Sequence, residues 1–106
     1  SEVFVDKYIG RLINIHPSLL PKYPGLDTHK KVIENEDSRH GVTVHYVDKT
    51  LDGGPICAQS EIEVTTKDVN KLEEQIHEIE HEIYPLVVKQ IADGKMTFKD
   101  GKVIKK

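Results

Sequence analysis

The sequence predicts an α/β fold with a mixed β-sheet, in the element order β-α-β-β-α-β-β with the antiparallel part C-terminal. Two observations carry this prediction. Residues 12–15 form a short apolar run with two β-branched side chains, which is typical of a buried strand. Residues 67–92 repeat their apolar positions every three or four residues, which is typical of a long amphipathic helix. The first strand comes too early in the chain to have a neighbour on each side, which indicates a piece of a larger parallel sheet whose N-terminal strands are absent.

Shorter elements are expected before the long helix. Residues 1–8 are predicted as a short helix. Asp27 or Thr28 can cap a second short helix that reaches about residue 36. Residues 41–47 suit a half-buried strand, and residues 56–64 alternate more regularly between apolar and polar side chains.

The long helix has clear signals at its C-terminal end. Pro85 is expected to kink it, and Gly94 is a natural residue to follow its last turn. Residues 96–104 then predict a hairpin about Asp100-Gly101, because this dipeptide suits a type I′ turn. The sheet is therefore expected to end in an antiparallel pair.

Composition and charge narrow the class of protein. The chain has 106 residues, which is one domain or part of one, and its net charge of −3 argues against a nucleic-acid-binding module. No apolar run approaches the roughly 18 residues of a membrane span, and no signal peptide is expected at 1–10. The single cysteine, Cys57, lies off the apolar face of its predicted strand, and we expect its thiol to be unreactive. Because one cysteine cannot form an internal disulfide, we expect the protein to reside in a reducing compartment, the cytoplasm.

Two polar residues, separated by one apolar residue, lie at the end of the predicted first strand. Asn14 and His16 are two apart, so their side chains point to the same face. Open α/β sheets place their sites at the C-terminal ends of strands. An amide beside an imidazole can stabilise an oxyanion that develops at a carbonyl group. The alternative is a polar strand end that caps its own backbone, which is the commoner use of this spacing.

A carboxylate lies in the glycine-containing loop before the third strand. The two glycines of Asp52-Gly53-Gly54 allow a tight turn or a close approach of the backbone to a ligand. A carboxylate held there could orient a histidine and favour its charged form. The alternative is a turn closed by the aspartate side chain itself, which is the commoner role of Asp-Gly.

A zinc-binding string lies on the predicted long helix. Residues 77–81 read H-E-x-x-H, in which a zinc hydrolase would use His77 and His81 as ligands and Glu78 as general base. The two histidines border the apolar stripe inside an acidic stretch, and no third ligand follows them. We therefore expect a solvated helix face there.

Four segments together resemble a known family. The run N-I-H-P-S-L-L-P-K-Y-P-G at 14–25 is similar, almost residue for residue, to the signature of the glycinamide ribonucleotide (phosphoribosylglycinamide) formyltransferases of purine biosynthesis. H-G-V-T-V-H at 40–45, L-D-G-G-P at 51–55 and E-I-Y-P at 82–85 recur at the intervals that this family shows. The resemblance extends over residues 1–101, which is nearly the whole chain.

The resemblance implies an activity and a catalytic trio. These enzymes transfer a formyl group from 10-formyltetrahydrofolate to the amine of glycinamide ribonucleotide. Asn14 would hydrogen-bond the formyl oxygen, and His16 would donate a proton and stabilise the tetrahedral oxyanion. Asp52 would pair with His16 and favour its protonated form. The amine attacks directly, so no enzyme nucleophile is needed.

The resemblance also implies two sets of binding residues. One set would contact the folate cosubstrate: Asn14, Asp48, Lys49, Thr50, Leu51 and Asp52. The other would contact the nucleotide: His77, Glu78, Ile79 and Glu80. Glu80 would bind the ribose hydroxyls, which gives the H-E-x-x-H string an explanation without a metal. No metal, nucleic acid or membrane is expected as a partner, and a homodimer stays open.

By the same resemblance, residues 1–106 correspond to the C-terminal catalytic portion of a formyltransferase with a Rossmann-like fold. The N-terminal half with its phosphate-binding loop is absent, so the chain by itself is expected to have weak activity or none. The enzyme alternative is formyltetrahydrofolate deformylase, which shares the trio but differs directly after its histidine. The alternative of another class is an interaction module that uses the amphipathic helix at 67–92.

Overall fold

The computed structural model describes residues 12–106, so the helix expected at 1–8 lies outside the described part of the chain. The predicted order of strands and helices from residue 12 onward is confirmed. The elements are β1 (Ile13–His16), α2 (Thr28–Glu34), β2 (Arg39–Tyr46), β3 (Ile56–Glu63), α3 (Val69–Ala92), β4 (Met96–Lys99) and β5 (Lys102–Lys105).

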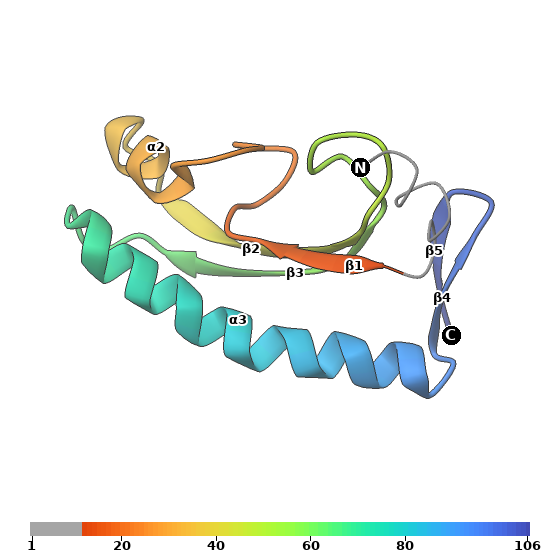
Figure 1. The fold of residues 1–106 in the computed structure, drawn as a ribbon. Coiled ribbons are helices and arrows are strands. Elements are labelled where there is room, and N and C mark those ends of the chain that lie inside the picture. The colour runs from red at the N-terminus through yellow and green to blue at the C-terminus, as the bar shows by residue number, and fades with distance from the viewer. Residues whose placement is uncertain (1–11) are drawn as a thin grey trace.

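The main sheet has the strand order β1-β2-β3, and both strand pairs are antiparallel. Among the described residues β1 is an edge strand, and the parallel strands of the predicted mixed sheet are not among them. Figure 1 shows α3 along one face of this sheet and the loops that follow β1 and β2 on the other, while α2 lies at one end of the sheet and packs against α3. The sheet therefore separates the molecule into a helical side and a loop side.

The central strand β2 differs from its prediction, which was a half-buried strand. Every residue from 40 to 46 is buried, on both faces. The prediction was wrong because β2 is paired on both edges, packs against α3 on one face and is covered by loops on the other. Three polar side chains, His40, Thr43 and His45, are thereby buried inside the sheet.

A bulge changes which side chains of β3 face the core. The register shifts between Val44 and His45, so that Val44 pairs with Ala58 and His45 pairs with Ile56. Cys57 is the extra residue and is fully buried, whereas Ile56 is 41% exposed. The alternation predicted for this strand is therefore wrong at its start. Burial raises the pKa of the Cys57 thiol to about 11, so the group stays protonated at neutral pH.

The two ends of α3 are fixed by capping. The helix begins at Val69 because the Asp68 side chain accepts hydrogen bonds from the backbone of Asn70 and Lys71. It continues through Pro85 as one element. Gly94 has φ 73°, and the backbone N–H groups of Gly94 and of the next residue bond back to the last turn, which confirms its predicted place.

The other helix and the hairpin give one correction and one confirmation. The side chain of Asp27 makes no capping bond to α2, and the hydroxyl of Thr28 donates instead to the carbonyl of Pro17 at 2.6 Å, so the predicted cap is wrong. The hairpin of β4 and β5 is confirmed, although it forms a two-stranded sheet of its own and does not end the main sheet as expected. Asp100 and Gly101 both have positive φ angles, as a type I′ turn requires.

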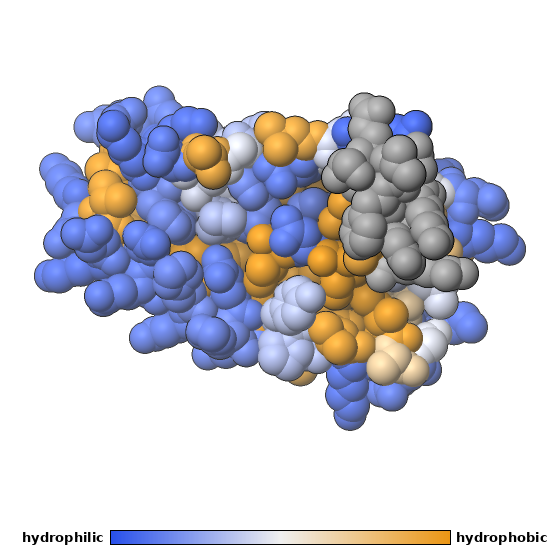
Figure 2. All heavy atoms as spheres, in the orientation of Figure 1, coloured by the Kyte–Doolittle hydropathy of each residue, from blue (hydrophilic) through white to orange (hydrophobic). Residues whose placement is uncertain are grey.

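The apolar stripe of α3 supplies much of the core. Leu72, Ile76, Ile83 and Val87 are buried against residues of β2 and β3. Figure 2 shows mostly hydrophilic side chains over α2 and the start of α3, and hydrophobic ones where β1 lies over the C-terminal part of α3. No helix in the described range is both long and apolar enough to cross a membrane.

Candidate active site

The structure brings His16 and Asp52 together. His16 is the last residue of β1 and is 5% exposed. Its Nδ1 lies 3.5 Å from Oδ2 of Asp52, and the same carboxylate oxygen accepts a 2.7 Å hydrogen bond from the backbone N–H of Gly25. Asp52 has φ 53°, a left-handed conformation that is uncommon for a residue other than glycine. The carboxylate is thus held from two sides.

The second ring nitrogen of His16 is also occupied. Its Nε2 lies 2.8 Å from the carbonyl oxygen of Tyr23. A carbonyl can only accept, so Nε2 carries a proton and donates it. Nδ1 carries a proton only in the charged ring, and that proton then faces Asp52, so the ring is oriented to donate at both nitrogens when it is charged. This is the arrangement that a carboxylate-stabilised proton donor needs.

Asn14 lies on the same face of the sheet as His16. The register places Asn14 opposite His45 and His16 opposite Thr43, so these four side chains share one face. Asn14 is exposed, and its side chain makes no hydrogen bond within residues 12–106. The structure therefore holds two of the three predicted catalytic residues in contact and leaves the amide of the third free for a ligand.

His45 is a site residue that the sequence analysis missed. It is 3% exposed, and its Nε2 lies 3.8 Å from Oδ1 of Asp52, the oxygen that His16 does not face. This nitrogen has no hydrogen-bond partner among the described residues, while Nδ1 donates to the carbonyl of Tyr46. Asp52 is therefore bracketed by two imidazoles. The spacing of His45 gives no signal until the pairing of β1 with β2 is known.

Except for Asn14 on β1, the predicted folate-contacting residues lie in the loop between β2 and β3. The carboxylate of Asp48 accepts hydrogen bonds from the backbone and the hydroxyl of Thr50, which closes a tight turn. The side chain of Leu51 is 74% exposed beside Asp52. A Cβ on Gly54 would overlap the carbonyl oxygen of Tyr46, so glycine is needed for the loop to leave the strand.

The predicted nucleotide-contacting residues lie on the other face of the sheet. His77 and Glu78 are exposed on α3, and His77 lies 3.8 Å from Glu73 one turn earlier. Ile79 packs against the core. Glu80 lines a hollow of about 240 Å³ with Ile15, His81, Tyr84 and Pro85. Because Ile15 and His16 point to opposite faces, the structure does not bring this set to the His16–Asp52 pair.

The H-E-x-x-H string has no metal geometry in the described part of the chain. His77, Glu78 and His81 are all exposed on α3. No group of three or more histidine, cysteine, aspartate or glutamate side chains within residues 12–106 is arranged to hold a metal ion.

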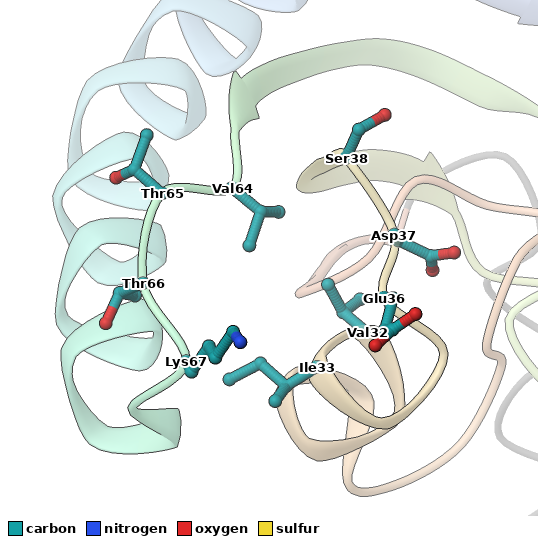
Figure 3. A pocket seen from close by; sticks show the side chains of 9 residues that line it. All are labelled: Val32, Ile33, Glu36, Asp37, Ser38, Val64, Thr65, Thr66 and Lys67. Carbon is teal, nitrogen blue, oxygen red and sulfur yellow. The ribbon is translucent and has the colours of Figure 1, made fainter.

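A larger pocket lies away from all of these residues. It has a volume of about 420 Å³ and lies between the end of α2 and the connection from β3 to α3. Figure 3 shows Lys67 on one side and Glu36 on the other, with Val32, Ile33 and Val64 between them. None of the predicted catalytic or binding residues lines it.

The chain resembles named formyltransferases over nearly its whole length. It is 50% identical over 97 residues to the phosphoribosylglycinamide formyltransferase of Escherichia coli (strain K12), a match that covers 91% of this chain and 46% of that protein. The solved structure of the phosphoribosylglycinamide formyltransferase from Coxiella burnetii has a TM-score of 0.92 at 42% identity, and the match covers 99% of this chain and 50% of that one. The chain therefore spans about half the length of these relatives.

A formyltetrahydrofolate deformylase from Pseudomonas syringae pv. tomato str. DC3000 has the same fold, with a TM-score of 0.90 at 24% identity. This likeness shows the fold alone. The predicted α/β class and the resemblance to phosphoribosylglycinamide formyltransferases are both confirmed. The sequence profile of the formyl transferase family matches residues 1–88, and the chain belongs to that family.

Proposed function

We propose that the chain is the catalytic portion of an enzyme that transfers a formyl group from 10-formyltetrahydrofolate to the amine of glycinamide ribonucleotide. The observation that carries the proposal is the buried His16–Asp52 pair at the end of β1, with Nδ1 of the imidazole facing the carboxylate and Nε2 fixed by a backbone carbonyl. The relatives named above, at 50% and 42% identity, carry this activity in their names.

In this mechanism the attacking nitrogen belongs to the substrate. The amine adds to the formyl carbon, and the carbonyl oxygen gains negative charge in the tetrahedral intermediate. Asn14 stabilises that oxygen by donating a hydrogen bond, and the positive charge of the nearby His16 ring stabilises it electrostatically. Asp52 stabilises the charged ring while a proton moves from the attacking amine, which is positively charged after the addition, to the departing folate nitrogen. Expulsion of that nitrogen leaves the formyl group on the nucleotide amine.

The remaining roles follow from position. The loop from Asp48 to Asp52 borders the carboxylate and offers the exposed side chain of Leu51 to the folate. Glu80 and its neighbours on α3 would contact the nucleotide from beside β1. We assign residues 1–106 to one catalytic portion, and the single cysteine, which cannot form an internal disulfide, favours a cytoplasmic location.

The interaction-module alternative loses its main support. Its seam would be the apolar stripe of α3, but four residues of that stripe are buried within this chain. The deformylase alternative keeps the same fold, and hydrolysis would use the same pair. The P-S-L-L-P-K-Y-P-G run at 17–25 favours the transferase.

The test uses the full-length protein, by which we mean this chain joined to the half of the fold that its relatives carry in addition. With 10-formyltetrahydrofolate and glycinamide ribonucleotide it should release tetrahydrofolate and formylated nucleotide in equal amounts. Without the nucleotide, turnover should stop. Release of formate at the same rate without nucleotide would establish the deformylase instead. The 106-residue chain alone should turn over far more slowly, because binding energy from remote parts of the substrate is lost.

A further inference from the structure

Tyr23 has an unusual backbone conformation next to the catalytic pair. Its φ is 52°, in the left-handed region, which is a genuine outlier for an aromatic residue. Its carbonyl oxygen is the acceptor for Nε2 of His16, and the hydroxyl of Ser18 lies 3.3 Å from the same oxygen. Strained residues persist only where surrounding contacts over-determine them. The contacts that hold Tyr23 are therefore informative.

The side chain of Tyr23 is fastened to a different part of the fold. Its hydroxyl donates a 2.6 Å hydrogen bond to Oδ2 of Asp37 and accepts one of 3.0 Å from the amide of Asn35. Asn35 and Asp37 belong to the turn between α2 and β2, and Lys22 lies 3.7 Å from the other oxygen of Asp37. The hydrogen bond to Asp37 and burial raise the pKa of the Tyr23 phenol, so the hydroxyl remains a donor throughout the neutral range.

The rest of the loop has its own anchors. Thr43 of β2 donates to the carbonyl of Ser18 at 2.8 Å and accepts from the backbone of Leu20 at 3.1 Å. The amide of Gln59 donates to the carbonyl of Leu20. These bonds fix the loop near β2 without Tyr23. The far end of the loop, where the carbonyl meets His16, is held by the Tyr23 hydroxyl together with the Gly25–Asp52 bond and the bond from the Ser18 hydroxyl to the carbonyl of Lys22.

We propose that Tyr23 is a positioning residue for His16. The bond between its hydroxyl and Asp37 holds its strained carbonyl against Nε2, which keeps the proton there and leaves Nδ1 facing Asp52. Which nitrogen of a histidine is protonated is set by the hydrogen bond that the other makes. The turn between α2 and β2 thereby controls the orientation of the proton donor through one side chain. The expected fall in kcat rests on the proposed function, whereas the expected orientation and protonation of the His16 ring do not.

The kinetic test compares three variants in the full-length protein. Tyr23→Phe keeps the ring and removes the hydroxyl, so kcat for formyl transfer should fall about 10- to 100-fold while KM for both substrates changes less than about threefold. The pH profile of kcat should move, because the ring of His16 is no longer held. Asp37→Asn, whose amide oxygen can still accept the bond, should retain more activity than Tyr23→Phe. Arg39→Gln is the control, since it removes an exposed 2.9 Å bond to Glu61 beside the same turn.

A second readout does not depend on activity. Nitrogen NMR of the imidazole of His16 should show a proton on Nε2 that exchanges slowly with solvent in the wild-type and Arg39→Gln proteins and faster in Tyr23→Phe. A Tyr23→Phe protein with wild-type kcat, pH profile and proton exchange would overturn the proposal. Absence of formyl transfer in the wild type would overturn the proposed function instead, and the exchange rates would then decide the role of Tyr23 alone.

Discussion

The two groups of predicted site residues lie on opposite faces of one sheet, and they are held in different ways. The corner made by His16, Tyr23 and Asp52 is largely buried and closed by hydrogen bonds, and two of its residues have positive φ angles. The stretch 77–80 lies on a regular helix, and two of its four side chains are exposed. The difference supports the proposal above, in which the corner carries the chemistry, which needs exact orientation, and α3 contacts the nucleotide.

The largest effect is expected at the carboxylate. Asp52→Asn keeps the size of the side chain but removes the charge that stabilises a protonated His16. In the full-length protein kcat should fall by about 10²- to 10⁴-fold, the range of general acid–base catalysis. KM for the nucleotide should change only a few-fold, because other groups bind it. Steady-state kinetics at saturating folate measures both. An unchanged kcat would mean that Asp52 only shapes its loop.

The loop that carries Asp52 should tolerate no added methyl group at Gly54. Gly54→Ala places a Cβ against the carbonyl of Tyr46, and because that neighbour is backbone the loop must shift. We expect a loss of about 2–4 kcal/mol in the free energy of unfolding. Gly94→Ala is the matched control, since Gly94 has φ 73° but open space around it and should lose only about 1 kcal/mol. Urea unfolding of the two variants measures the contrast, and equal losses would contradict it.

Acid should destabilise the helical side of the sheet through a buried histidine, because His40 shares the face of β2 on which Val42 and Val44 pack with α3. Burial, followed by the neighbouring His29, lowers the pKa of His40 to about 4, while Asp37 acts in the opposite direction. Nε2 of His40 lies 3.0 Å from Nδ1 of His29, so two charged rings would repel each other. The neutral ring is favoured in the folded state. Its contribution is therefore complete above about pH 6.5 and is lost as the pH falls toward 4.

The free energy of unfolding should accordingly decrease between pH 6.5 and 4, by at most about 1.4 kcal/mol for each unit of difference between folded and unfolded pKa. Urea unfolding at several pH values measures this slope. His40→Gln should flatten it, whereas His81→Gln, on the exposed face of α3, should leave it as in the wild type. A slope that His40→Gln does not change would assign the acid sensitivity to other groups.

The smallest effect is expected on α3. Glu80→Gln in the full-length protein should raise KM for glycinamide ribonucleotide about tenfold, equivalent to about 1.4 kcal/mol, and leave kcat unchanged. The control is Glu82→Gln, which removes the same charge from an exposed side chain two residues further along the helix and should change neither KM nor kcat. A fall in kcat for Glu80→Gln would show that binding and chemistry are not separated between the two faces.

The regular elements were predictable because each depends on local chemistry. The stripe of α3, its glycine stop at Gly94 and the Asp100-Gly101 hairpin all follow from neighbouring residues and are confirmed. The placement of His16 at a strand end also followed from the sequence. Its pairing with Asp52 came from the family resemblance, since the 35 residues between the two include a whole helix and a whole strand.

What could not be predicted depends on strand pairing. His45 joins the site only because the register of β1 with β2 places it opposite Asn14. Cys57 enters the core only because a bulge shifts β3 by one residue. The anchoring of Tyr23 by Asp37 links two loops, and its strained backbone has no sequence signature.

The most direct test of this account is the single-turnover rate of formyl transfer by the full-length protein at saturating concentrations of both substrates. Wild type, Asp52→Asn and Glu80→Gln are compared under one condition, so differences in binding do not contribute. We predict that Glu80→Gln reacts at the wild-type rate and that Asp52→Asn reacts at least a hundredfold more slowly. Equal rates for wild type and Asp52→Asn, or a slow rate confined to Glu80→Gln, would contradict the assignment of the chemistry to the corner of His16 and Asp52.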